Sequence, residues 1–188
     1  MDNTGISTDT VKLVIADDHP LFREGLKRIV NMENDLEVIG ECGDGIHVIE
    51  LCNALHPEVV LMDINMPIEN GVAATEKIKT LFPDIKIIIL SIHDDESYVF
   101  ETLRKGASGY LLKDMEAESL INAIRSVVQG YAYIHPKVTG KLINQLRRMT
   151  YLNEAGVGGN SEELNEAGVR YVHNAGNPLT RREAEVLS

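Results

Sequence analysis

Acidic, hydroxyl and ammonium side chains follow four separate apolar segments of this sequence, each at the point where its segment ends. Asp17 and Asp18 follow the first of these segments, Asp63 the second, and Ser91 and Lys113 the last two. Grouped carboxylates repel one another unless a hard cation neutralises them, and oxygen ligands suit Mg²⁺. An aspartate carboxylate can attack phosphorus to give an acyl phosphate, while a metal ion and a lysine neutralise the phosphoryl oxygens. If the fold brings these residues together, they are suited to phosphoryl transfer to an aspartate.

The elements that must position these residues alternate between short apolar runs and amphipathic segments. Apolar residues at helical spacing predict the helices, and continuous apolar runs are typical of parallel strands covered on both faces. Right-handed crossovers favour an α/β, doubly wound, flavodoxin-like sheet of five parallel strands in the order 2-1-3-4-5. The expected strands are 11–16, 36–42, 59–62, 86–90 and 109–112, and the expected helices are 20–32, 45–55, 71–81, 97–105 and 115–128.

Functional groups of such a sheet gather at the carboxyl ends of its strands. We therefore expect the five polar residues to converge on one edge from positions nearly 100 residues apart. Each of them also has a simpler structural explanation. Asp18 precedes a His-Pro pair and could cap a helix, and a serine at a strand end is common. His93, Asp94 and Asp95 are expected to form a solvated loop. The full set at successive strand ends is what indicates function.

The sequence changes character after Gly130. A helix is expected over 138–149, and the stretch 150–178 is rich in Gly, Asn and Glu, which favours a flexible linker. Thr180 and Glu183 form a capping box, which predicts the start of another helix. The expected organisation is a disordered N-terminus at 1–10, a domain at 11–130, a helix and flexible linker at 131–178, and the truncated start of a further all-α domain at 179–188.

Charge and hydropathy restrict the classes of partner. The formal net charge is −11, with 11 basic and 23 acidic residues in 1–136 and 7 and 6 in 137–188. The acidic domain disfavours contact with nucleic acid, because the phosphates would be repelled. No apolar run approaches the ~20 residues of a membrane span, and the N-terminus lacks a signal-sequence pattern. We expect a cytoplasmic protein that makes no membrane contact.

Several stretches resemble known regulatory domains. VIADDHPLFREGL, LMDINMPIENG, IIILS and GYLLK resemble the receiver domain of bacterial two-component response regulators. LTRREAEVL resembles the opening of a LuxR-type helix-turn-helix domain, so the chain resembles the NarL/FixJ class of transcription factors. SIHDDESYV, GYLLKDMEAESLI and IHPKVT are most similar to DegU-like regulators within that class.

This resemblance implies a role for each residue of the acidic group. It implies that Asp63 is the phosphoacceptor and also a metal ligand. Asp18 would bind Mg²⁺ directly and Asp17 would support the ion, often through water. Asn65 would give its backbone carbonyl to the metal.

The resemblance also implies how the site would respond to phosphorylation. Ser91 and Lys113 would contact the phosphoryl group, and Tyr110 would be an aromatic switch that turns inward together with a shift of Ser91. Asp114 departs from the pattern, because many receivers carry proline after the lysine.

The implied partners are a sensor histidine kinase, a second copy of the chain after phosphorylation, and promoter DNA for the full-length parent. We expect no DNA-binding residues in this chain, because it stops before the recognition helix that reads bases. We also expect no enzyme activity beyond the chain's own phosphorylation and dephosphorylation. Two alternatives stay open: a stand-alone receiver that works through protein contacts, and a phosphatase of the haloacid dehalogenase type. The second expects an aspartate where Asn65 stands.

Overall fold

The computed structural model describes residues 10–94, 96–155, 162–164 and 170–172. The chain divides into two units, with the boundary between Leu142 and Ile143. The first unit contains a parallel sheet with its covering helices. The expectations for residues 1–9 and for the capping-box helix at 179–188 lie outside the described residues.

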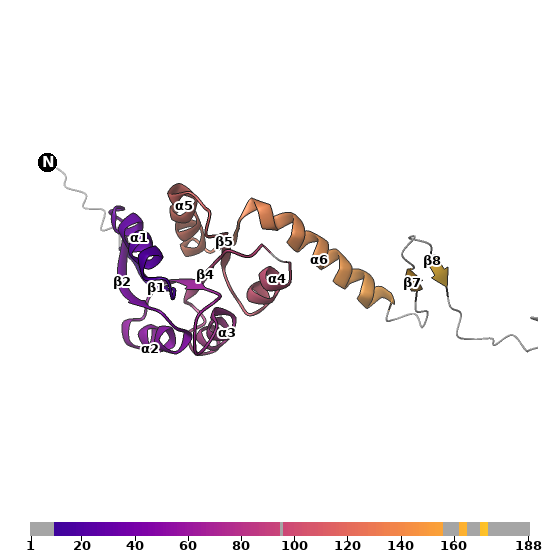
Figure 1. Cartoon of the computed structure of the whole chain (residues 1–188), viewed down its shortest axis with the longest axis horizontal. Coiled ribbons are helices and arrows are strands. Elements are labelled where there is room, and N and C mark those ends of the chain that lie inside the picture. The colour runs from indigo at the N-terminus through magenta and orange to yellow at the C-terminus, as the bar shows by residue number, and fades with distance from the viewer. Residues whose placement is uncertain (1–9, 95, 156–161, 165–169, 173–188) are drawn as a thin grey trace, which may run out of the picture. The chain divides into compact units, whose positions relative to one another are not determined.

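The sheet of the first unit has six parallel strands in the order β2-β1-β3-β4-β5-β6 (Figure 1). The predicted doubly wound order is confirmed, but the predicted number of five strands is wrong by one short strand. The strands are β1 (Val11–Ala16), β2 (Leu36–Cys42), β3 (Val59–Asp63), β4 (Lys86–Ser91), β5 (Gly109–Leu112) and β6 (Tyr133–Ile134). The helices are α1 (Pro20–Asn31), α2 (Gly45–Leu55), α3 (Gly71–Leu81), α4 (Glu96–Arg104), α5 (Ala117–Val128) and α6 (Pro136–Ala155).

β6 was missed because two residues carry no periodicity that a sequence pattern can reveal. Its backbone pairs with the edge strand β5, with Tyr133 beside Gly109 and Ile134 beside Tyr110. The strand therefore covers an edge that five strands would have left open, and it leads directly into α6.

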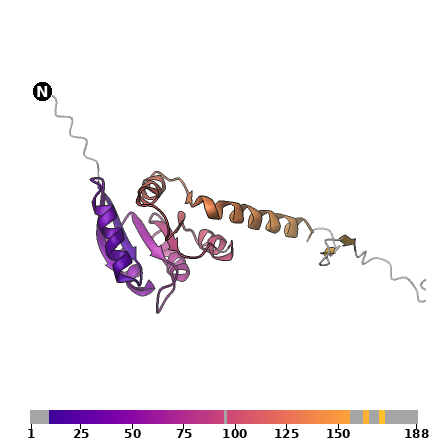
Figure 2. The same cartoon turned by 45° about the horizontal axis from the view of Figure 1, so that its top comes forward.

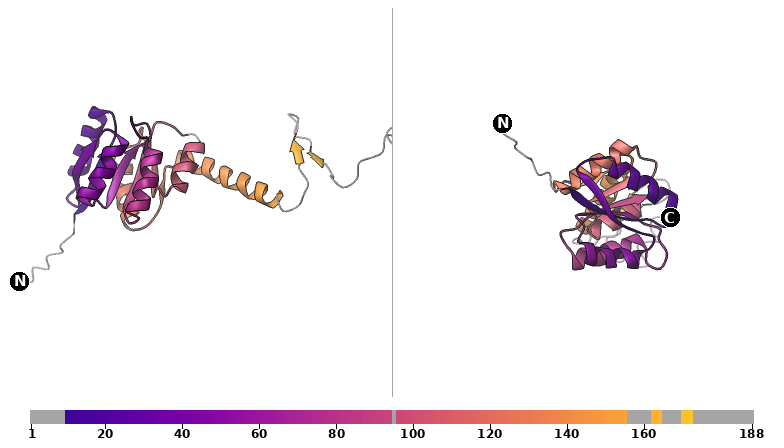
Figure 3. Two further views of the ribbon diagram at one scale, coloured as in Figure 1. Left: turned by 90° about the horizontal axis from the view of Figure 1, so that it is seen from below. Right: turned by 90° about the vertical axis from the view of Figure 1, so that its left-hand side faces the viewer.

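Helices cover both faces of the sheet, as continuous apolar strands predict. One face packs against α2, α3 and α4, and the other packs against α1 and α5 (Figures 2 and 3). Along β1, Val14 and Ala16 face the first set of helices, whereas Leu13 and Ile15 face the second. All four side chains are fully buried. Two apolar layers thus fix the strands whose ends carry the polar residues.

The start of α1 differs from the expected cap. The N-cap residue is His19, with no side-chain cap, and Pro20 occupies the first turn. The suggestion that Asp18 caps this helix is therefore wrong, because the helix begins one residue later than that role requires. The carboxylate of Asp18 remains available for other contacts.

The region after β6 contains more regular structure than predicted. α6 is longer than the expected 138–149 at both ends. Within the stretch expected to be a flexible linker, β7 (Glu162–Leu164) and β8 (Arg170–Val172) form an antiparallel pair. Among the described residues, no helix combines the length and the apolar character needed to cross a membrane.

Candidate functional site

The register of the sheet places the ends of four strands side by side. Ala16 of β1 pairs with Met62 of β3, Asp63 of β3 with Leu90 of β4, and Ser91 of β4 with Leu112 of β5. The residues that follow these pairs must therefore share one edge. The structure brings together the predicted residues Asp17, Asp18, Asp63, Asn65, Ser91, Tyr110 and Lys113 around this edge.

Lys113 lies between two buried carboxylates. Its Nζ is 2.8 Å from Asp17 Oδ2 and 3.0 Å from Asp63 Oδ2. The same Nζ lies 4.9 Å from the centroid of the Phe22 ring, so the ammonium group also makes a cation–π contact. The backbone amide of Lys113 donates to the carbonyl of Ser91 at 2.8 Å, which ties the end of β5 to the end of β4.

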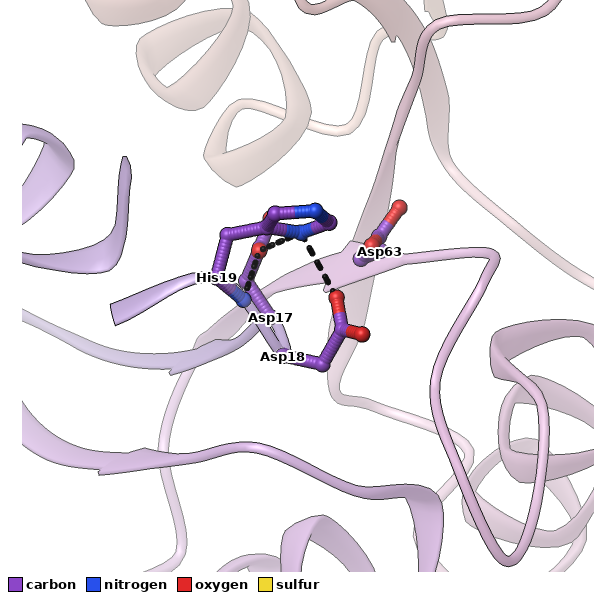
Figure 4. A group of neighbouring side chains, drawn as sticks. All are labelled: Asp17, Asp18, His19 and Asp63. Carbon is purple, nitrogen blue, oxygen red and sulfur yellow. Dashed lines mark hydrogen bonds and ion pairs between the residues drawn. The ribbon is translucent and has the colours of Figure 1, made fainter. Parts of the chain in front are cut away.

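A compact group of potential ligands forms the floor of the site (Figure 4). Ligand atoms of Asp17, Asp18, His19 and Asp63 all lie within 4.8 Å of one another. His19 Nδ1 is 2.7 Å from Asp18 Oδ1 and 3.3 Å from Asp17 Oδ1. Sequence reasoning did not single out His19, although its place directly after the acidic pair was the available signal.

The donor set fits a hard cation. Asp17 Oδ2 and Asp63 Oδ2 are buried, and both face the single ammonium group of Lys113. One lysine cannot neutralise three clustered carboxylates, and carboxylate oxygens are the ligands of Mg²⁺ and Ca²⁺. The partly exposed Asp18 leaves the group open to solvent on one side. The acidic group can therefore hold a metal ion.

Burial makes the ionised form of Asp63 costly. It raises the pKa of Asp63 above its usual value, and the neighbouring charge of Asp17 adds to this rise. Lys113 opposes the rise through its hydrogen bond and its charge. A positive ion beside Asp63 would further favour the carboxylate, so the electrostatics of the site agree with its donor set.

A cavity of about 420 Å³ gives access to Asp63 from solvent. Its rim includes the highly exposed apolar side chains of Leu21 and Ile92. A cavity of about 490 Å³ opens elsewhere, near the start of β4, and contains none of the predicted site residues. The residues that line the first cavity are His19, Leu21, Phe22, Asp63, Asn65, Ile92 and Lys113.

His93 connects the two predicted switch residues. Its backbone N–H donates to Ser91 Oγ at 2.9 Å, and its carbonyl accepts from the hydroxyl of Tyr110 at 2.8 Å. Its ring lies 3.2 Å from Asn65 Nδ2 and stacks on Tyr98 with centroids 5.7 Å apart. His93 lies in a loop, as expected, but it is half-buried and both its backbone and its ring have partners. Asp94 is exposed, and Asp95 lies outside the described residues.

Tyr110 is fully buried and points inward in this structure. The expected inward turn of this ring on phosphorylation stays a prediction. The hydroxyl of Tyr110 donates to the carbonyl of His93, and Ser91 is also fully buried.

Gly71 lets the loop after β3 fold back against the site. Its N–H donates to the carbonyl of Ile64 at 2.9 Å. A Cβ atom at this position would lie 2.0 Å from the backbone oxygen of Asp63. Only glycine permits so close an approach, so Gly71 helps to fix Asp63 and the neighbouring Asn65.

Comparison with known proteins decides the family. The response regulator receiver domain family matches residues 13–125. The chain belongs to this family. It is 49% identical to the transcriptional regulatory protein DegU of Brevibacillus brevis over 187 residues, which cover 98% of this chain and 76% of that protein. The chain is thus a two-component response regulator, homologous to transcriptional regulators.

Solved structures agree with this assignment. A LuxR-family response regulator from Aurantimonas sp. SI85-9A1 superposes with a TM-score of 0.70 and 26% identity, covering 73% of this chain and 99% of that one. A structure of two RcsB dimers bound to two parallel DNAs superposes with a TM-score of 0.66 and 25% identity, covering 71% of this chain and 68% of that one. The resemblance to LuxR-type regulators is confirmed.

Proposed function

We propose that Asp63 accepts a phosphoryl group from a sensor histidine kinase. This transfer controls how the full-length parent regulates transcription. The observation that carries the proposal is the position of the Asp63 carboxylate, which faces Lys113 beside the acidic pair and lines an open cavity. The Asp63 nucleophile, the Lys113 ammonium group and an opening to solvent therefore lie at the same place. The catalysis is limited to the chain's own phosphorylation and dephosphorylation.

The cation in this proposal is Mg²⁺, held by Asp17, Asp18, Asp63 and the backbone carbonyl of Asn65. Bound Mg²⁺ supplies positive charge to the oxygens of the transferring group. The fit rests on three clustered carboxylates that share one lysine, with Asp17 and Asp63 buried and Asp18 partly exposed.

Lys113 and Ser91 complete the proposed site. The ammonium of Lys113 already touches Asp63, so a short movement of a flexible side chain lets it bind a phosphoryl oxygen as well. The hydroxyl of Ser91 accepts a hydrogen bond from His93 and keeps its own hydrogen to donate. These two donors stabilise the negative charge that arrives on Asp63.

The response to phosphorylation is proposed to pass through Ser91 and Tyr110 to the surface around α4 and β5. A ligand shifts a conformational equilibrium only through contacts that differ between the two states. The link through His93 supplies such contacts. Self-association after phosphorylation and promoter binding by the full-length parent are proposed by analogy with the structurally similar RcsB, whose dimers bind DNA.

The test is phosphoryl transfer from labelled acetyl phosphate in the presence of Mg²⁺. We expect the chain to gain one phosphoryl group, labile in alkali as an acyl phosphate. Asp63→Asn keeps the shape of the side chain but lacks the nucleophile, so it should gain none. Asp84→Asn, an exposed aspartate away from the site, is the matched control and should label like the wild type. Label that persists on Asp63→Asn would refute the assignment.

A further inference from the structure

Residues 135–142, here called the strap, comprise His135 and the first turns of α6. Two lysines of the strap form ion pairs with the loop after β4 and the loop after β5. Lys137 Nζ lies 2.8 Å from Asp114 Oδ2, and Asp114 directly follows Lys113. Lys141 Nζ lies 2.5 Å from Asp94 Oδ2, three residues after Ser91. Because the two lysines are four positions apart on a helix, they project from the same face. One helical face thus spans the ends of β4 and β5.

The strap is also anchored by apolar packing over Tyr110. Val138 is fully buried in the same core cluster as Tyr110, and Leu142 packs against that cluster from a partly buried position. The backbone N–H of His135 donates to the carbonyl of Tyr110 at 2.9 Å. The strap therefore adjoins the strand that carries Tyr110 and shares its core cluster.

These contacts give a structural role to Asp114, which departs from the receiver pattern. Proline at this position would carry no carboxylate for Lys137. The pair is exposed, with 62% of Lys137 and 61% of Asp114 accessible, so it is screened by solvent and contributes little alone. The pair matters because it links the residue after Lys113 directly to α6.

We propose that the strap tightens when Asp63 carries a phosphoryl group, so that the start of α6 reports the state of the site. The inference rests on the proposed function. Ser91 and Tyr110 both bond to the backbone of His93, and the next residue, Asp94, holds Lys141. A phosphoryl group that draws Ser91 toward Asp63 moves the backbone of His93, and with it the Asp94 carboxylate that pairs with Lys141.

Coupling between two sites is reciprocal. If the bound ligand favours the closed strap by some factor, the closed strap favours ligand binding by the same factor. Loss of both exposed ion pairs should raise opening of the strap by about 2- to 30-fold, the range that two such pairs usually supply. Affinity of the site for a phosphoryl analogue should fall, by at most the factor through which that analogue protects the strap.

The experiment uses the 188-residue chain with Mg²⁺ and the phosphate analogue beryllofluoride. Hydrogen exchange of the 138–142 amides is measured with and without the analogue, together with exchange in the loop after Asp63 and the affinity for beryllofluoride. The strap variant is Lys137→Gln with Lys141→Gln. The control is Arg147→Gln, which removes one positive charge, half of what the strap variant loses, from an exposed position further along α6.

We expect beryllofluoride to slow exchange at 138–142 in the wild type and in the control. The strap variant should exchange faster there and bind beryllofluoride more weakly. Reversing one pair, Asp94→Lys with Lys141→Asp, should restore slow exchange relative to Lys141→Asp alone. Protection of the loop after Asp63 with unchanged exchange at 138–142 would overturn the strap and leave the phosphoacceptor intact. No protection at either place would overturn the proposed function, and the strap with it.

Discussion

Replacing Lys113 with methionine removes the positive charge between two buried carboxylates while keeping an unbranched side chain of similar length. Lys113 Nζ lies within 3.0 Å of both Asp17 and Asp63, and its side chain is only 12% exposed. Removing one partner of a buried ion pair typically lowers the free energy of unfolding by about 3–5 kcal/mol, because the charge left behind is uncompensated. We expect a loss in this range for Lys113→Met at neutral pH without Mg²⁺.

Addition of Mg²⁺ should recover part of this loss. A ligand that binds only the folded state stabilises it by about 2.7 kcal/mol at 100 times its dissociation constant. Denaturant unfolding with and without Mg²⁺ measures the loss in free energy of unfolding and the part that Mg²⁺ recovers. Lys137→Met is the control, since its exposed pair with Asp114 should contribute about 0–1 kcal/mol. A loss for Lys113→Met no larger than for the control, or no recovery with Mg²⁺, would refute the electrostatic account of the site.

Three further predictions concern the same edge of the sheet. Gly71→Ala should lower the free energy of unfolding by about 1–3 kcal/mol or more, because its Cβ would clash with the Asp63 carbonyl. Gly140→Ala has open space around its Cβ and should be neutral or stabilising in the same denaturant titration. Burial raises the pKa of Asp63, so Asp63 binds its proton more tightly in the folded than in the unfolded chain. The stability that this proton contributes is lost as the pH rises from 3.8 through the folded pKa. Asp63→Asn should therefore gain stability relative to the wild type across that pH window, and an unchanged difference would contradict the raised pKa. Asp18→Ala should weaken Mg²⁺ binding in calorimetric titration, and unchanged affinity would remove Asp18 from the metal site.

Much of the fold and of the acidic site could be predicted because both depend on local patterns. Runs such as Lys86–Leu90 are apolar throughout, which indicates strands covered on both faces. Once the strands are parallel, their carboxyl ends meet at one edge, and Asp17, Asp63 and Lys113 must come together. The pairing of Lys113 with both carboxylates follows from that geometry.

Contacts that depend on tertiary packing could not be predicted. The two residues of β6 pair only because β5 offers an open edge, and the role of His93 depends on a backbone carbonyl that no residue pattern reveals. The ion pair of Asp114 with Lys137 joins residues 23 positions apart through the path of α6. Asp114 could be recognised as a departure, but its partner required the structure.

The measurement that tests the central claim most directly is chemical mapping of the phosphoryl group. The chain is phosphorylated with acetyl phosphate and Mg²⁺, the acyl phosphate is reduced with borohydride, and the resulting homoserine is located by peptide sequencing in a mass spectrometer. The account predicts homoserine at position 63 alone, because the Asp63 carboxylate combines access from the cavity with contact to Lys113. Homoserine at Asp17 or Asp18, or no reducible phosphoryl group at all, would contradict it.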